Sequence, residues 1–188
     1  MTVETQYQTL EEAALSLNLT TKTVEQWFDA GALLGKKEAT GLEILKSSIL
    51  TIIEERQNYV MISPVASDVL KIAIVEDDLD LTKLLEMTIH NFDYKTQIYS
   101  CTNGLSGLAL HCEYRPDVLI ADLNMPIMDG FRMINALENS ELAPKKIIVT
   151  TALSVEDIKA RGGLPERAIV ISKPFSLSEL ESHLQPNH

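Results

Sequence analysis

The chain has 188 residues, of which 45% are hydrophobic and 23% charged, and its formal net charge is −11. These proportions are ordinary for a globular protein and exclude a wholly disordered, collagen-like or low-complexity chain, while the length allows one large domain or two small ones. An acidic surface repels phosphate backbones at long range, which argues against nonspecific nucleic-acid binding. Because no run of 18 apolar residues occurs and residues 1–10 lack the pattern of a signal peptide, we expect a cytoplasmic protein with no membrane span.

Residues 1–62 are predicted to form a small all-α domain. Thr9 suits the N-cap of a first helix, and Gly31 suits the end of a second. Ser63-Pro64 breaks the helical pattern, so residues 63–69 are predicted to be a linker. The predicted elements are helices over 11–17 and 21–30, a turn at 18–20 between them, a basic glycine-flanked segment over 35–41, and a long helix from about 42 to 59.

Residues 70–186 alternate apolar strands with amphipathic helices. Continuous apolar runs such as 117–121 are typical of buried parallel strands. Right-handed crossovers then place helices on both faces of a five-stranded parallel sheet, so the predicted class is α/β. The predicted strands are 71–75, 96–99, 117–121, 145–150 and 168–172, and the predicted helices are 79–92, 104–112, 131–137, 155–160 and 177–184.

Charged and hydroxyl side chains follow the predicted strands, at the edge of the sheet where α/β folds bind ligands. Carboxylates that converge there repel one another, and a divalent cation such as Mg²⁺ supplies the counter-charge together with a lysine. Such a site stabilises a phosphoryl group that is transferred to a carboxylate. Acids at loop ends are also common as solvated groups, but four strand ends with complementary chemistry favour a site. The candidate residues are Glu76 and Asp77 after the first strand, Asp122 after the third, Thr151 after the fourth and Lys173 after the fifth.

The segments that carry these residues resemble a response-regulator receiver domain, namely Ile74–Asp78, Ile120–Gly130, Val149–Ala152 and Lys173–Phe175. The resemblance implies a flavodoxin-like fold in which Asp122 accepts phosphate from a sensor histidine kinase or a phosphotransfer protein. It also implies that Asp77, Asp122 and the backbone carbonyl of Asn124 ligate Mg²⁺, and that Glu76 acts through a water. Thr151 and Lys173 would contact the phosphoryl oxygens, and the bond before Pro174 would be cis.

The family often places an aromatic residue three positions before this lysine, and that residue takes part in activation. Here the position holds Val170. The coupling of activation to structural change in this part of the domain is therefore expected to be altered. A receiver catalyses only its own phosphorylation and dephosphorylation, so we do not expect an enzyme that acts on other substrates.

Residues 9–33 resemble the helix-turn-helix of the MerR/excisionase-like winged-helix group, with 35–41 as the wing. The resemblance implies DNA reading by the second helix, although residues 1–62 hold 5 basic and 9 acidic residues, net −4. The alternative is that the fold serves as a protein-interaction module. The candidate DNA contacts are Thr20, Thr21, Lys22, Thr23, Gln26, Lys36 and Lys37.

The predicted long helix, as a segment over 42–62, carries an apolar series with roughly heptad spacing. Its members are Leu42, Leu45, Ile49, Ile52 and Tyr59. The series either packs on its own domain or pairs with a second copy of the chain, which would give a homodimer or higher oligomer.

The sequence as a whole therefore predicts a response regulator with reversed order, in which a DNA-binding effector precedes the receiver and controls transcription. The alternative is a phosphorylation-controlled adaptor that binds a protein partner.

Overall fold

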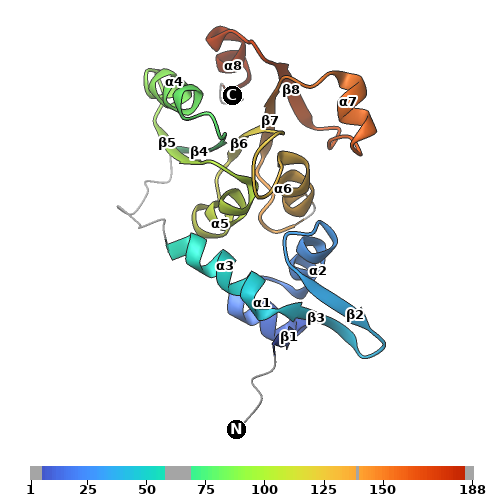
Figure 1. The fold of residues 1–188 in the computed structure, drawn as a ribbon. Coiled ribbons are helices and arrows are strands. Elements are labelled where there is room, and N and C mark those ends of the chain that lie inside the picture. Colours follow the sequence, from blue (N-terminus) through green and yellow to red (C-terminus); the bar gives the residue numbers. More distant parts are fainter. Residues whose placement is uncertain (1–5, 58–68, 139, 185–188) are drawn as a thin grey trace.

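The computed structural model describes residues 6–57, 69–138 and 140–184, which form an N-terminal unit and a C-terminal unit (Figure 1). The N-terminal unit spans residues 6–57 and contains a three-stranded sheet, and the C-terminal unit spans residues 69–184 and contains a five-stranded sheet. The end of the predicted long helix and nearly all of the predicted linker, residues 58–68, lie outside the described residues.

The C-terminal unit has the predicted α/β order. Its sheet is parallel throughout, with the strand order β5-β4-β6-β7-β8. The chain runs outward from β4 to β5, returns to β6 on the other side of β4, and continues to β7 and β8, as in doubly wound folds. The elements are β4 (Leu70–Val75), α4 (Leu79–His90), β5 (Thr96–Cys101), α5 (Gly104–Tyr114), β6 (Val118–Asp122), α6 (Gly130–Leu137), β7 (Lys146–Thr151), α7 (Val155–Ala160), β8 (Ala168–Ser172) and α8 (Leu177–Leu184).

Alternate side chains of the central strands supply two apolar cores. Because successive side chains point to opposite faces of a strand, Ile72 and Ile74 join one core with α4 and α8, while Ala73 and Val75 join the other with α5 and α6. Figure 1 shows α4 and α8 on one side of the sheet and α5 and α6 on the side that faces the N-terminal unit.

The N-terminal unit contains strands that the sequence prediction missed, so the prediction of an all-α domain is wrong. Its elements are β1 (Tyr7–Thr9), α1 (Leu10–Leu17), α2 (Thr21–Asp29), β2 (Gly35–Glu38), β3 (Gly41–Leu45) and α3 (Lys46–Gln57). Thr9 and Glu12 form a capping box at the start of α1, and Thr20 is the N-cap of α2. The segment predicted as a wing is the antiparallel β2–β3 hairpin.

The predicted long helix is shorter than expected, because residues Gly41–Leu45 belong to β3 and α3 begins only at Lys46. Leu42 and Ile44 are buried on one face of that strand. Ile49 and Ile52 are buried in the apolar core of the same chain. The apolar series is therefore not one continuous helical face, and its described members Leu42, Ile49 and Ile52 pack within the chain. Tyr59 lies outside the described residues, and the predicted homodimer or higher oligomer stays a prediction.

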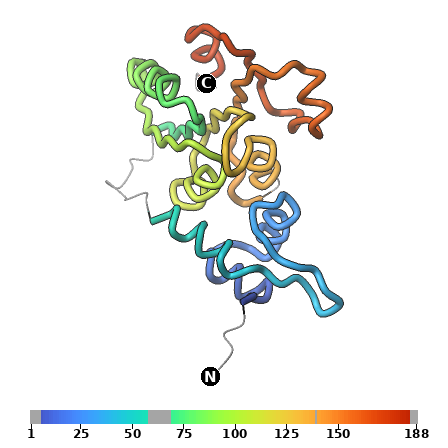
Figure 2. The backbone as a smooth tube through the Cα atoms, viewed as in Figure 1, coloured from blue at the N-terminus to red at the C-terminus, as the bar shows by residue number. Residues whose placement is uncertain are grey.

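The two units pack against each other through helices. Helix α3 lies against α5, and α2 lies beside α6 (Figure 2). Because α5 is covered by the sheet on one side and by α3 on the other, nine of its residues are buried, including the polar Ser106 and His111. One apolar core consequently runs from Ala13 to Ile158 across both units. Among the described helices, none is both long and apolar enough to cross a membrane.

Candidate functional site

Three carboxylates meet at the carboxyl edge of the parallel sheet, as predicted. Glu76 and Asp77 directly follow β4, and Asp122 is the last residue of the adjacent strand β6. Oxygen atoms from the three side chains lie within 4.8 Å of one another. Glu76 and Asp122 are buried, whereas Asp77 is exposed. The cluster is thus open to solvent through Asp77.

Lys173 joins the cluster from the end of β8. Its ammonium group donates to both Glu76 carboxylate oxygens, at 2.7 and 3.0 Å, and to Asp122 Oδ1 at 3.1 Å. The bond between Lys173 and Pro174 is cis, as predicted. Asp122 Oδ2 accepts a hydrogen bond of 2.7 Å from the backbone N–H of Asn124. Both oxygens of Asp122 are therefore held in fixed directions.

The net charge of the cluster favours the binding of a cation. Burial raises the pKa of Glu76 above its ordinary value, although the hydrogen bonds from Lys173 act in the opposite direction. Burial lowers the pKa of Lys173, but its hydrogen bonds to Glu76 and Asp122 outweigh this and raise it. Three carboxylates against one ammonium leave a net charge of −2. A divalent cation with hard oxygen ligands matches both this charge and this donor set.

The remaining predicted site residues surround the cluster. Thr151 ends β7 and is buried, its hydroxyl accepts a hydrogen bond from Leu153 N–H at 3.2 Å, and its carbonyl accepts one from Lys173 N–H at 2.7 Å. Val170 lies on β8 and is half exposed. The site thus brings together the predicted Thr151 and Lys173. Val170, at the position that is often aromatic in the family, lies at the surface.

Sequence reasoning missed Arg161, which directly follows α7. Its guanidinium donates to the side-chain oxygen of Asn124 at 2.8 Å and lies over the ring of Phe131. Asn124 in turn donates to Asp122, so Arg161 fixes the loop beside the carboxylate cluster. The position of Arg161 depends on where α7 ends, and no motif indicates it.

Gly130 is required by the close approach of α6 to the strand end. A Cβ atom at this position would lie 2.1 Å from the backbone oxygen of Asp122 and 2.9 Å from Leu123 Cα. We expect Gly130→Ala to lower the free energy of unfolding in urea by about 3 kcal/mol, because backbone atoms cannot yield as a side chain can. Gly162→Ala is the comparison, since its Cβ meets no atom within 4 Å and only its positive φ opposes the change. Equal losses for both variants would contradict the steric argument.

The candidate DNA contacts lie in different surroundings. Thr21, Lys22 and Lys37 are exposed, whereas Thr23 is buried and Gln26 is half buried. Thr20 and Thr23 bond to the C-terminal unit. Lys36 pairs with Glu38 at 2.7 Å and with Glu43 at 3.0 Å within the hairpin.

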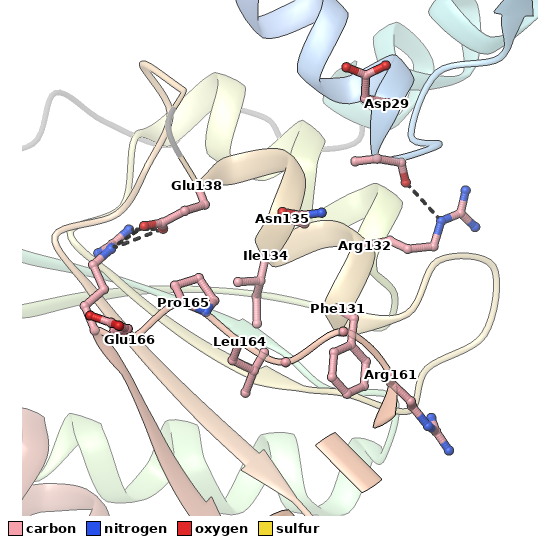
Figure 3. Close-up of a pocket in the computed structure, with 14 residues that line it drawn as sticks. Asp29, Phe131, Arg132, Ile134, Asn135, Glu138, Arg161, Leu164, Pro165 and Glu166 are labelled. Carbon is pink, nitrogen blue, oxygen red and sulfur yellow. Dashed lines mark hydrogen bonds and ion pairs between the residues drawn. The ribbon is translucent and has the colours of Figure 1, made fainter. Parts of the chain in front are cut away.

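A pocket of about 740 Å³ lies where the two units meet (Figure 3). Asp29, the last residue of α2, and Ala30, which follows it, line the pocket on one side, and Phe131 and Arg132 line it from α6. The opposite wall is the loop between α7 and β8. Figure 3 shows Arg132 directed toward the end of α2, where it donates to the carbonyl of Ala30.

Comparison with known proteins identifies the fold of the C-terminal unit. The family model described as response regulator receiver domain matches residues 72–185. The chain is 32% identical over 119 residues to the sensor histidine kinase TmoS of Ectopseudomonas mendocina, covering 63% of this chain and 12% of that protein. It is 30% identical over 113 residues to the probable transcriptional regulator ycf29 of Pyropia yezoensis, covering 60% and 50%. The chain thus spans half or less of the length of these relatives.

Solved structures agree with the same fold. The receiver domain of a signal transduction histidine kinase from Syntrophus aciditrophicus is 29% identical, with a TM-score of 0.54 and coverage of 60% of this chain and 85% of that one. The receiver domain of the sensor histidine kinase PA1611 from Pseudomonas aeruginosa is 20% identical, with a TM-score of 0.52 and coverage of 60% and 92%. In that protein a magnesium ion is coordinated in the active-site cleft.

Proposed function

The chain belongs to the response regulator receiver domain family, and from this we propose that Asp122 accepts a phosphoryl group from a sensor histidine kinase or a phosphotransfer protein. The observation that carries the proposal is the pair of contacts on Asp122, from Lys173 Nζ to one oxygen and from Asn124 N–H to the other. These contacts orient the carboxylate for attack while one face of the cluster stays open at Asp77.

In the proposed reaction a carboxylate oxygen of Asp122 forms a bond to phosphorus, and the bond between phosphorus and the donor's histidine nitrogen breaks. Lys173 stays protonated and offsets the charge of the transferred oxygens. Thr151 lies at the end of the neighbouring strand, where its hydroxyl can donate to the phosphoryl group. Mg²⁺, held by Asp77, Asp122 and the carbonyl of Asn124, with Glu76 beside it through a water, would neutralise negative charge during the transfer. The protein would then modify only itself.

For the N-terminal unit we propose transcriptional control through DNA binding. Two helices joined by a three-residue turn and followed by a β-hairpin support this, as does the name of one relative, a probable transcriptional regulator. A protein-binding adaptor is the second candidate, because the unit is acidic and Lys36 is already paired with Glu38 and Glu43.

Selection from a random pool of duplex DNA separates the two candidates. The full chain is incubated with the pool at low and moderate salt, with and without beryllofluoride and Mg²⁺ as a phosphoryl mimic. We expect enrichment of a motif that depends on beryllofluoride and weakens with salt. An inverted repeat would show that two copies bind together. Asp122→Asn is the control, and a folded, beryllofluoride-loaded wild-type protein that enriches no motif would favour the adaptor.

A further inference from the structure

The loop between β6 and α6 carries the contact that fixes one oxygen of Asp122. Both ends of this loop are anchored, because Leu123 and Met128 are buried and the Met128 carbonyl accepts a hydrogen bond from Gly104 N–H at 3.0 Å. Asn124 lies between these anchors and is exposed, yet its backbone N–H donates to Asp122 Oδ2 at 2.7 Å. Burial therefore fixes the ends of the loop but not Asn124 itself.

The side chain of Asn124 is held from the end of α7. Arg161 Nη1 donates to Asn124 Oδ1 at 2.8 Å, and the guanidinium carbon lies 6.0 Å from the ring centroid of Phe131 in the first turn of α6. Figure 3 shows the Arg161 side chain beside Phe131. One planar group thus contacts an amide oxygen and an aromatic face at once, which the compact charge of a lysine on a flexible stem cannot reproduce.

The backbone of Arg161 is itself fixed. Ser154 and Asp157 form a capping box at the start of α7, and Ile158 on the same helix is buried in the core. At the other end of the helix, Arg161 N–H donates to the carbonyls of Asp157 and Ile158, at 3.1 and 3.2 Å. The guanidinium therefore extends from a helix that is capped at both ends, and it ties the exposed Asn124 to that helix.

We propose that Arg161 is a positioning residue of the phosphorylation site, acting through Asn124. The proposal rests on the function proposed above, in which Asp122 attacks phosphorus and the backbone carbonyl of Asn124 helps to hold Mg²⁺. The N–H and the carbonyl of one residue turn with its backbone angles, so a hold on the Asn124 side chain limits how far both can turn. Arg161 then keeps the N–H on Asp122 Oδ2 and keeps the carbonyl available to the cation, as outer partners of metal ligands do.

The positive charge of Arg161 makes the sign of its effect informative. A positive charge near the carboxylate cluster repels Mg²⁺, so by charge alone the loss of Arg161 would strengthen Mg²⁺ binding. The loss of positioning would weaken it. Arg161→Lys separates the two effects again, because it keeps the charge but not the planar contact. Charge alone predicts no change in this variant, whereas positioning predicts weaker binding.

The test is a titration of the full-length protein with Mg²⁺ alone, followed by the backbone amide signals in nitrogen–proton correlation NMR spectra. We expect Arg161→Ala and Arg161→Lys each to raise the Kd for Mg²⁺ about fivefold, the effect of losing one hydrogen bond. The amide proton of Asn124 should move upfield in both variants, because its hydrogen bond to Asp122 Oδ2 weakens. Lys159→Ala removes an exposed positive charge from the last turn of α7 and is the matched control, which should not raise the Kd.

Asn124→Ala removes the other partner of the same hydrogen bond. It should raise the Kd for Mg²⁺ about as far as Arg161→Ala does, and the double variant should exceed the larger single effect only slightly. Effects that add in full would show that Arg161 does not act through Asn124. Equal or tighter Mg²⁺ binding in Arg161→Ala would overturn the proposal outright.

Phosphorylation by acetyl phosphate, followed by intact mass, separates this proposal from the function on which it rests. At limiting Mg²⁺, Arg161→Ala should gain the phosphoryl group about fivefold more slowly than the wild type, in proportion to its lower occupancy by the cation. If the wild type is phosphorylated and Arg161→Ala binds Mg²⁺ equally well, the positioning role is refuted while the function stands. If the wild type binds Mg²⁺ but gains no phosphoryl group, the proposed function fails and the role of Arg161 in it fails as well.

Discussion

Replacing Asp122 by Asn is expected to abolish covalent phosphorylation of the protein. The carboxamide has no anionic oxygen that can attack phosphorus, and it removes one of three acidic donors from the cluster with Glu76 and Asp77. The size of the side chain is unchanged, so the fold should be retained. The measurement is the intact mass of the protein after incubation with acetyl phosphate and Mg²⁺. The wild type should gain the mass of one phosphoryl group, and Asp122→Asn should gain none.

The matched control is Asp93→Asn, which makes the same chemical change at an exposed residue in the loop between α4 and β5, at the other edge of the sheet. It should be phosphorylated like the wild type. Chelation of Mg²⁺ should suppress phosphorylation of both the wild type and Asp93→Asn. Phosphorylation of Asp122→Asn at the wild-type level would show that another residue is the acceptor and would refute the proposed site.

Below about pH 6.5 the protein is expected to lose stability because burial disfavours protonation of His111 in the folded state. His111 is fully buried in α5, and Nδ1 donates to the Gly107 carbonyl at 2.9 Å. Burial lowers its pKa from 6.5 to about 4, despite the opposing effect of the hydrogen bond to Gly107. Between these values the unfolded chain binds more protons than the folded one. The free energy of unfolding is therefore highest above about pH 6.5 and decreases as the pH falls toward 4, by roughly 3 kcal/mol in total.

Urea unfolding at several pH values between 7 and 4 measures this effect. The wild type is compared with His111→Gln at each pH, so that contributions common to both proteins cancel. The Gln variant should be less stable at pH 7, and the difference should shrink or reverse as the pH falls. His90→Gln, at an exposed position at the end of α4, should follow the wild type. Parallel curves for the wild type and His111→Gln would contradict the assignment.

The receiver fold and its acidic site follow closely from the sequence. Apolar runs with crossover helices between them admit essentially one sheet, and the sheet brings the residues that follow its strands to one edge. The sequence therefore predicts that Glu76, Asp122 and Lys173 lie together. Arg161 could not, because its position depends on where α7 ends and on the rotamer of a long side chain.

The N-terminal strands were missed for two physical reasons. Strand β1 has only three residues, too few to establish an alternation. In β3, Leu42 and Ile44 alternate with Glu43 and Leu45 as a strand requires, but Leu42 and Leu45 also continue the spacing of Ile49 and Ile52 in α3. The strand and helix periodicities thus overlap here, and the apolar spacing by itself favours a helix.

The docking of α2 on the receiver could not be predicted from the sequence. Thr20 and Glu141 are 121 residues apart in the chain, and no local pattern relates them. The same holds for Arg132 and Gly31, which are 101 residues apart. Such contacts depend on the relative placement of two units, which local periodicity does not encode.

The burial of α5 on both sides has a thermal consequence. If the N-terminal unit moves away, the face of α5 that α3 covers must be hydrated, and hydration of apolar surface carries a positive heat capacity. The enthalpy of separating the units then grows with temperature, so the balance between the docked and separated arrangements follows a curve with a maximum. Cooling and warming from that maximum would both favour separation, and the two units would stay docked most stably within a limited range of temperature.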